Sequence, residues 1–519
     1  MNDAEIQDKI VQALHDSSCY PHPVGQVRHI ETHISHVMLT GQFAYKIKKP
    51  LDLGFLDFST LEKRRFCCEE ELRLNRRLAP DVYLEVVTIN GKPESPRING
   101  TGPILEYAVK MRQFDPASGL DQLEEQGRLT LHHADAMAET VADFHARIPG
   151  VPLDSAWGSA ETIWQPVAQN FEQIAARIDG KSEAQDLLNT IRAWSEAGHA
   201  RLAPEFEQRR VQGFVRECHG DLHLGNMAWE NDRLLVFDCI EFNPALRWID
   251  VMSEVAFCYM DLLHRGHHDF AARFINRYLE RTGDYAGMML LRFYAVYRAM
   301  VRAKVAFIRA SQAGLSTKDV THETGQGMAY LQLADQLIRQ RSPHLAVTHG
   351  LSGSGKTTFS QELIMSFEMI SLRSDIERKR LAGLDALAKS GSGMESGIYT
   401  RDFSRRTYKH LASLAEKLLQ AGWSVLVDAT FIARWQRDLF RQLADRCGVP
   451  LHILDFAVPD EVLRQRVQAR SAEGRDASEA DVAVLEQQLK THEPLTSEER
   501  EFVIEAESIE SVVAKLIGK

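Results

Sequence analysis

The chain has 519 residues, of which 44% are hydrophobic and 26% charged, and a formal net charge of −11. Such a length favours two or three domains over one core, and the acidic balance argues against a broad nucleic-acid surface. The seven scattered cysteines show no metal-site spacing, the start "MNDAEIQDKIVQAL" is not typical of a signal peptide, and no apolar run reaches the roughly 18 residues of a membrane span. We therefore expect a cytoplasmic protein with free thiols and no membrane partner.

The first third of the chain predicts a small sheet with few helices. A short helix is expected at residues 1–18, strands at 27–49, and a helix in "STLEKRRFCCEEELRLNRRLAP" that Ser59 or Thr60 caps and Pro80 ends. Two more strands, "VYLEVVTI" and "PILEYAVKMRQF", flank the turn-rich "NGKPESPRINGTG". Residues 121–212 read as mainly helical. Short strands follow in "VRECHGD", "NMAWEN" and "RLLVFDCIEF", and helices resume until about residue 341.

The last third has a different pattern. After Pro343, the strand-like segments "HLAVTH", "MISLRSD", "WSVLVDAT" and "LHILDFAV" alternate with helix-like sequence. This alternation predicts a parallel sheet with helices on both faces. We expect a fusion of an α+β domain at residues 1–341 with an α/β domain at residues 342–519.

The segment "HGDLHLGN" at 219–226 carries residues suited to phosphoryl transfer, which depends on positioning and charge neutralisation. Asp221 is suited to accept the proton of an attacking hydroxyl, and Asn226 to hold Mg²⁺ through its amide oxygen. Asp238 ends the apolar run "LLVF", where a carboxylate would reach the same metal. A plain turn with a buried histidine is the alternative for an isolated HxD pair.

A lysine and an acidic partner are expected upstream. "FAYKIKKP" places Lys46 and Lys48 on one face of a strand, and one of them should reach the α- and β-phosphates. Glu71, on the following helix, is suited to fix that lysine by an ion pair. Solvated surface charges are the alternative.

These motifs carry a family resemblance over about residues 20–335. "HGDLHLGN", with the HxDxxxxN spacing of the protein-kinase catalytic loop, and "VFDCIEFNPALRWIDVMSEVAF" resemble the aminoglycoside phosphotransferase and choline kinase group. The resemblance implies a protein-kinase-like bilobal fold, with a small lobe at about 20–115 and a helical lobe at about 116–341. It implies that Asp221 is the catalytic base, that Asn226 and Asp238 hold Mg²⁺, and that Lys46 binds phosphate.

The resemblance also has finer implications. Adenine is expected against the backbone of 106–109, and Asp250 and His219 are expected to brace the catalytic loop. One departure is that "ETHISH" stands where a glycine-rich loop is expected. Glu241 is either a second metal contact or a capping carboxylate.

A second nucleotide motif, "GLSGSGKT" at 350–357, fits G-x₄-GK-[ST] between a strand and a helix. Its backbone N–H groups and the helix N-terminus would bind phosphates, Lys356 would neutralise their charge, and Thr357 would offer a hydroxyl to Mg²⁺. A flexible Gly/Ser loop is the alternative. The predicted nucleotide-binding residues are Gly350, Gly353, Ser354, Gly355, Lys356, Thr357 and Thr358.

Further charged residues surround this motif in the sequence. Asp375, between Arg373 and Arg378, is suited to deprotonate a substrate hydroxyl while the arginines bind anionic groups; a helix cap with surface basic residues is the alternative. Asp428 ends the strand "VLVD", where it would orient Mg²⁺. A lid of arginines, or an ordinary solvated helix face, is expected from Arg466, Arg470 and Arg475.

"RSDIERKRLAG" and "DATF" make residues 343–519 similar to the P-loop kinases grouped with polynucleotide kinase, zeta-toxin, gluconate kinase and chloramphenicol phosphotransferase. We predict a bifunctional, ATP- and Mg²⁺-dependent phosphotransferase in which each half transfers the γ-phosphate to a hydroxyl of a small molecule. Three alternatives remain: an amino-terminal half that only regulates, a non-enzymatic nucleotide sensor that binds a protein partner, and a carboxyl-terminal nucleic-acid end kinase. The sequence has no signature of an oligomeric state.

Overall fold

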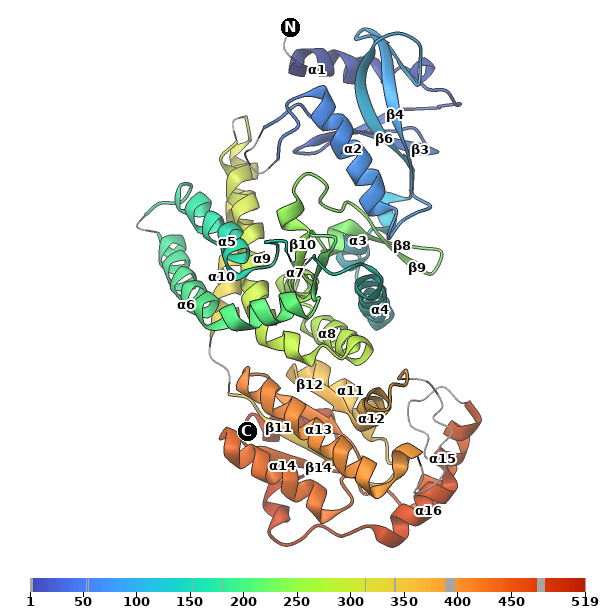
Figure 1. Ribbon diagram of the computed structural model, residues 1–519, viewed down its shortest axis with the longest axis vertical. Coiled ribbons are helices and arrows are strands. Elements are labelled where there is room, and N and C mark those ends of the chain that lie inside the picture. Colours follow the sequence, from blue (N-terminus) through green and yellow to red (C-terminus); the bar gives the residue numbers. More distant parts are fainter. Residues whose placement is uncertain are drawn as a thin grey trace. The chain divides into compact units, whose positions relative to one another are not determined.

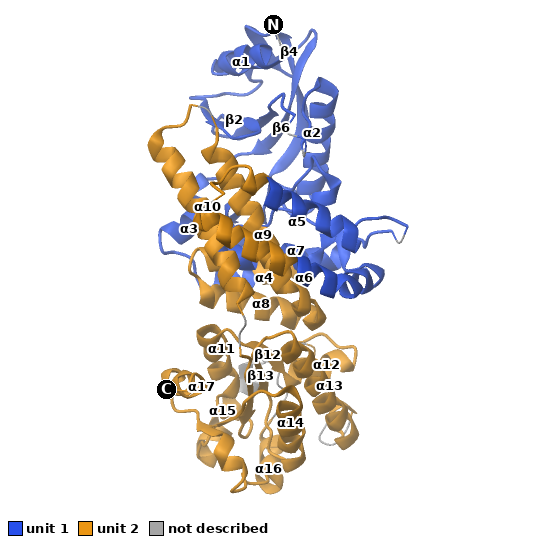
Figure 2. Ribbon diagram, turned by 90° about the vertical axis from the view of Figure 1, so that its left-hand side faces the viewer, with its two compact units in different colours: residues 1–136, 143–172, 196–261 blue, residues 137–142, 173–195, 262–519 orange. Residues whose placement is uncertain are grey.

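The computed structural model describes residues 3–518 except 53, 55, 153, 181, 313, 340–341, 387, 389–396 and 474–480. The side chains of 470–473 are not described either. By its internal contacts the chain divides into two compact units (Figure 2). The first unit comprises residues 1–136, 143–172 and 196–261, and the second comprises residues 137–142, 173–195 and 262–519. The border expected between 341 and 342 adjoins residues outside the described part of the chain and stays a prediction.

The amino-terminal sheet is antiparallel, with six strands in the order β1-β2-β3-β6-β4-β5 (Figure 1). In β3, Tyr45 and Ile47 point into the core, so Lys46 and Lys48 share the opposite face, as the period of two predicts. Thr60 caps α2, because its hydroxyl accepts from the backbone N–H of Lys63. The elements are α1 Asp3–Ala13, β1 Arg28–Glu31, β2 Ser35–Leu39, β3 Phe43–Lys48, α2 Leu61–Asn75, β4 Tyr83–Lys92, β5 Ser95–Ile98 and β6 Ile104–Arg112.

The middle of the chain is mainly helical and holds two short antiparallel pairs, β7 with β10 and β8 with β9. Among the described helices, none combines the length and apolar character needed to cross a lipid bilayer. The helices are α3 Leu120–Glu125, α4 Leu131–Arg147, α5 Ala160–Ala175, α6 Glu183–Val211, α7 Val251–His264, α8 His268–Thr282, α9 Met288–Ala310 and α10 Thr317–Ile338. The strands are β7 Val215–Glu217, β8 Met227–Glu230, β9 Arg233–Val236 and β10 Trp248–Asp250.

The carboxyl-terminal sheet is parallel, with the order β12-β13-β11-β14-β15, which confirms the predicted α/β architecture. Helices α11 and α17 cover one face and α13 and α14 the other (Figures 1 and 2). The strands are β11 Leu345–His349, β12 Ile370–Arg373, β13 Val425–Asp428, β14 Leu451–Asp455 and β15 Val503–Glu505. The helices are α11 Lys356–Phe367, α12 Ser374–Leu381, α13 Arg401–Gln420, α14 Arg434–Cys447, α15 Asp460–Glu473, α16 Val482–Thr491 and α17 Ile509–Leu516.

Three short strands lie where the sequence predicts none. Strand β5 falls in the turn-rich segment between the two predicted strands, and it contains Pro96. Strand β5 is an edge strand with a neighbour on one side only, and proline is tolerated in such strands. Strands β10 and β15 have three residues each, which is too short for a recognisable period.

A pair of histidines in the parallel sheet gives a pH-dependent prediction. His452 Nε2 lies 3.1 Å from His344 Nδ1, and burial together with His344 lowers the pKa of His452 from 6.5 to about 4. The unfolded chain therefore binds this proton at a higher pH than the folded chain does, so the free energy of unfolding should fall as the pH drops from 6.5 towards 4. We expect a loss of about 2 kcal/mol between pH 7 and pH 5 from this group. Urea unfolding at several pH values should give a flatter profile for His452→Gln, and profiles of equal slope would contradict the prediction.

Candidate active sites

The predicted catalytic loop, residues 219–226, lies between β7 and β8 in the first unit. Gly220 has φ +92°, and a Cβ there would lie 2.8 Å from the carbonyl oxygen of Leu246, so the turn requires glycine. The Asn226 amide nitrogen donates to the Asp221 backbone oxygen (2.9 Å) and to its carboxylate (3.2 Å). The Asp221 side chain is 37% exposed. The Asp221 carboxylate is thus open to solvent. Because the Asn226 amide nitrogen faces Asp221, the Asn226 amide oxygen points away from Asp221.

His219 braces this loop from within the core. Its Nδ1 accepts from the backbone N–H of Asp221 (3.2 Å), and its Nε2 donates to the carbonyl oxygen of Phe237 (2.8 Å). Phe237 directly precedes Asp238. The buried imidazole therefore joins the backbones that carry the two predicted carboxylates, in the bracing role expected for it.

The bracing role expected for Asp250 belongs to Glu254. Asp250 makes a two-point ion pair with Arg209 (2.7 and 2.9 Å). One Glu254 oxygen instead accepts from the backbone N–H groups of His219 (2.7 Å) and Gly220 (2.8 Å). Asp250 is the last residue of β10 and Glu254 lies in the first turn of α7, and this difference of position decides which carboxylate faces the loop.

Two lysines and three carboxylates of the first unit form a charged cluster. Lys46 Nζ lies 2.9 Å from one Glu71 oxygen and also contacts Asp238. Lys48 Nζ lies 2.6 Å from the other Glu71 oxygen and contacts Glu241. Lys48 is 1% exposed, whereas Asp238 is 45% exposed. Lys46 is thus the lysine nearer to solvent. Lys48 lies deeper, where it shares Glu71 with Lys46 and has the buried Glu241 as its second partner.

The cluster strongly shifts the pKa values of its members. Burial alone would raise the pKa of Glu71, but Lys46 and Lys48 outweigh it and lower this pKa to about 2. Burial raises the pKa of Glu241, and Lys48 only partly offsets it. Burial opposes the charge on both lysines, yet the carboxylates hold their pKa values above the usual range. Lys46 therefore stays positively charged at neutral pH.

Asp238 and the β1–β2 turn define the rest of this site. Asp238 has φ +67°, a left-handed conformation that aspartate tolerates better than most residues, and its N–H donates to the hydroxyl of Tyr83 (3.1 Å). In the turn between β1 and β2, Ser35 donates its backbone N–H to the Thr32 hydroxyl (2.9 Å). This turn spans only residues 32–34, in line with the missing glycine-rich loop.

The second candidate site lies at the carboxyl ends of the parallel strands. Gly353 and Gly355 have φ +85° and +92°, and a Cβ on Gly353 would lie 2.9 Å from a Val467 methyl carbon. Lys356 Nζ donates to the Leu351 carbonyl oxygen (2.7 Å) and the Ser354 hydroxyl (3.2 Å), so its ammonium group curls over the loop. Gly350 directly follows β11, and Thr357 and Thr358 lie in the first turn of α11.

Asp428, at the end of β13, stands beside this loop. It accepts from the Thr357 hydroxyl (2.8 Å), and Arg373 Nε lies 4.0 Å from the same oxygen. Burial raises the pKa of Asp428, Arg373 and Lys356 oppose that rise, and the nearby Asp375 carboxylate adds to it. The structure thus brings the predicted metal ligands, base and lysine of this half to one edge of the sheet.

The other predicted arginines are placed differently. Arg378 is buried, and its Nη1 donates to the Ile398 carbonyl oxygen (3.0 Å) and the Ser404 hydroxyl (3.1 Å), so its guanidinium orders a neighbouring segment. Arg466 Nη1 reaches the Gly353 carbonyl oxygen at 3.5 Å. The Arg470 side chain and Arg475 lie outside the described residues.

Comparison with protein families agrees with this geometry. Residues 68–291 match a model described as "Phosphotransferase enzyme family", and residues 345–495 match one described as "AAA domain". The first match makes residues 68–291 a phosphotransferase-family domain, and the second covers the P-loop motif at 350–357. The chain is therefore an ATP-dependent phosphotransferase.

One relative and two solved structures illustrate what the chain is similar to. An uncharacterized protein of Mycobacterium tuberculosis is 28% identical over 477 residues, which cover 91% of this chain and 92% of that protein. A choline/ethanolamine kinase family protein of Mesorhizobium loti is 10% identical, with 64% of this chain and 99% of that chain covered and a TM-score of 0.38. A gluconokinase of Sinorhizobium meliloti is 19% identical, with 34% and 90% covered and a TM-score of 0.25.

The expected adenine contact at 106–109 in the phosphotransferase domain is wrong. Strand β6 is central, and Val109 lies opposite Lys46 of β3 on one edge and Val86 of β4 on the other. Ala108 also pairs with both neighbouring strands, and Glu106 and Tyr107 pair with β4, so the sheet occupies backbone groups that adenine would need. The chain leaves the sheet only after Arg112, which places the connecting segment at 113–118.

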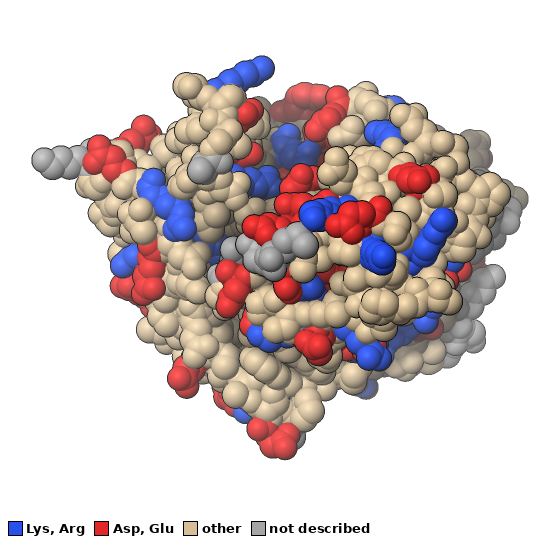
Figure 3. Space-filling view, turned by 90° about the horizontal axis from the view of Figure 1, so that it is seen from above, with Lys and Arg blue, Asp and Glu red and all other residues tan. Residues whose placement is uncertain are grey.

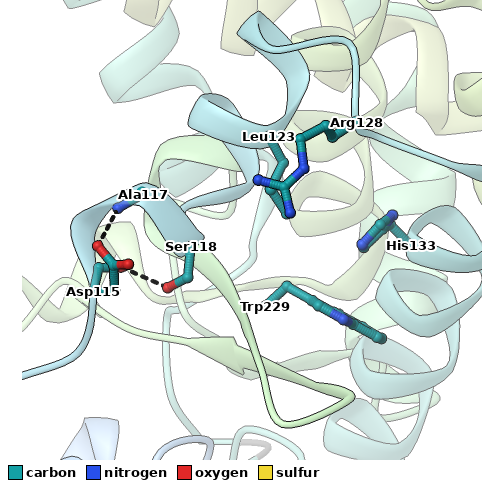
Figure 4. A pocket seen from close by; sticks show the side chains of 7 residues that line it. All are labelled: Asp115, Ala117, Ser118, Leu123, Arg128, His133 and Trp229. Carbon is teal, nitrogen blue, oxygen red and sulfur yellow. Dashed lines mark hydrogen bonds between the residues drawn. The ribbon is translucent and has the colours of Figure 1, made fainter.

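This connecting segment borders a hollow in the phosphotransferase domain. A cavity of about 380 Å³ lies there, and Figure 4 shows the Arg128 guanidinium, the His133 ring and the Trp229 indole around it. None of the residues that line it belongs to the Asp221 loop or the lysine cluster. The cavity is lined by Asp115, Ala117, Ser118, Leu123, Arg128, His133 and Trp229.

Proposed function

We propose that both domains are catalytic and that each transfers the γ-phosphate of ATP to a hydroxyl group of a small molecule. The observation that carries this proposal is the repetition of one arrangement. Each compact unit holds, among its own residues, a lysine, a carboxylate proposed to bind metal and an aspartate proposed to face an acceptor hydroxyl. Asp221 and Asp375 are the proposed bases.

The contacts in the phosphotransferase domain support these roles. Lys46 carries a positive charge beside Asp238, and Asn226 donates to Asp221 so that its amide oxygen is turned to the opposite side. Oxygen donors of this kind are the ligands that Mg²⁺ prefers, so the residues fit the ion. Asn226 and Asp238 would hold Mg²⁺, which neutralises phosphate charge when bound. The backbone of 113–118 is the proposed adenine contact.

The P-loop domain supports the second activity in the same way. Its loop has the positive φ angles that direct backbone N–H groups inward, and Lys356 lies across the loop. The Thr357 hydroxyl and the Asp428 carboxylate are 2.8 Å apart, a pair that fits a hydrated Mg²⁺ ion. Asp375, in the first turn of α12, would take the proton of the acceptor, and Arg373 and Arg466 would face the phosphates.

A polynucleotide acceptor is the less favoured alternative. On the face shown in Figure 3, acidic and basic side chains are interspersed over the surface. The whole chain carries a net charge of −11, whereas nucleic-acid binding relies on excess positive charge. We therefore propose small, polar acceptors for both sites.

The test uses full-length Asp221→Asn and Asp375→Asn, each incubated with ATP, Mg²⁺ and a panel of hydroxyl-bearing metabolites. Products are identified by mass spectrometry. We expect each substitution to remove one set of phosphorylated products and to leave the other set intact. Loss of all products with one substitution would overturn independent catalysis, and an unchanged product set for Asp221→Asn would assign the phosphotransferase domain a regulatory role instead.

A further inference from the structure

Helix α8 lies along the free edge of the parallel sheet, within the second compact unit (Figure 2). Strand β12 is the edge strand, and the Asn276 side chain pairs with it as a neighbouring strand would. Its amide nitrogen donates to the Met369 carbonyl oxygen (2.9 Å), and its amide oxygen accepts from the N–H of Ser371 (2.7 Å). Asn276 is 3% exposed. A buried amide with both ends bonded to the strand fixes the position of β12.

One helical turn further, α8 presents a carboxylate to the proposed acceptor side of the P-loop site. Glu280 Oε1 lies 3.8 Å from Arg373 Nη1, and Arg373 Nε lies 4.0 Å from Asp428 Oδ2. The backbone oxygen of Glu280 accepts from Arg380 Nη2 (2.6 Å), which holds this end of α8 against α12. Arg373 thus stands between two carboxylates at nearly equal distance, one from α8 and one from the P-loop site.

Glu280 and Asp428 compete for the guanidinium of Arg373. Asp428 and Thr357 are the residues proposed to hold Mg²⁺, and a cation paired with Asp428 opposes that binding. The Glu280 carboxylate attracts the Arg373 guanidinium away from Asp428. Without the charge on Glu280, Arg373 would close on Asp428, which lies buried where charge interactions are strong.

We propose that helix α8 is a working part of the P-loop site, in which Asn276 fixes the edge strand and Glu280 is a positioning residue that keeps Arg373 from neutralising Asp428. This inference rests on the proposed function of Asp428. It gives residues upstream of the P-loop motif a direct influence on the metal dependence of the P-loop domain.

The test measures Mg²⁺-dependent binding of a fluorescent ATP analogue to the full-length chain. The parent carries Asp238→Asn, so that the signal reports the P-loop domain. In the Glu280→Gln variant, which keeps the shape of the side chain, we expect the Mg²⁺ concentration for half-maximal binding to rise about fivefold or more. Glu280→Asp keeps the charge and should restore most of the parent value, which a purely structural role would not predict.

Glu368→Gln is the matched control. It removes the negative charge of the carboxylate that contacts His268 (2.7 Å), another contact of α8 with the P-loop domain that does not involve Arg373. Its Mg²⁺ requirement should equal that of the parent. An unchanged requirement in Glu280→Gln, or an equal rise in Glu368→Gln, would overturn the inference. If the parent shows no Mg²⁺-dependent nucleotide binding, the proposed function of the P-loop domain fails as well.

Discussion

Replacing Lys48 by methionine is expected to lower the free energy of unfolding of the first unit by about 3–5 kcal/mol. The ammonium group of Lys48 lies between the carboxylates of Glu71 and Glu241, and its side chain is 1% exposed. Methionine fills a similar volume but leaves Glu241 buried without its cation. A buried charge that loses its partner costs far more than the pair contributes when intact. Urea unfolding, followed by circular dichroism, measures the change.

The neighbouring residue provides the control for this prediction. Lys49 pairs with Glu31 at 2.6 Å, but the Glu31 side chain is 59% exposed, so Lys49→Met should cost no more than about 1 kcal/mol. The cost of Lys48→Met should also shrink at acidic pH, because a protonated Glu241 needs no partner. Equal effects at the two lysines would show that the charged cluster does not stabilise the fold.

The contrast between Lys46 and Lys48 shows which features of this cluster the sequence predicts and which it does not. Alternation along "FAYKIKKP" places Lys46 and Lys48 on one face, and the order of motifs pairs that face with Glu71. Local pattern does not say which lysine is deeper, because that depends on Asp238 and Glu241, which lie almost 200 residues away in the chain. The sequence therefore predicts the cluster but not the separate roles within it.

The same distinction holds elsewhere in the fold. The loop at 350–357 is predictable because its glycines, lysine and threonine act within eight consecutive residues. The segment 106–109 is correctly predicted as a strand, but pairing on both edges, which excludes adenine, is a property of the whole sheet. Glu254 lies in the quoted segment at 236–257 and Glu280 lies outside every quoted motif, but the sequence encodes neither role, since each acts on backbone or side chains that only tertiary packing brings near.

Lys356→Met is expected to reduce phosphorylation by the P-loop domain by roughly 10²–10³-fold, because Lys356 supplies positive charge where the transferred phosphoryl group gains negative charge. In the structure its ammonium group donates to the Leu351 carbonyl oxygen and the Ser354 hydroxyl, so methionine would remove both of these hydrogen bonds together with the charge. Products of the phosphotransferase domain should persist, since its own lysine, Lys46, lies in the other unit. Lys490→Met, on the exposed side of α16, is the control and should change neither product set. A Lys356→Met protein that kept its P-loop products at the normal rate would show that the loop does not bind the transferred phosphate.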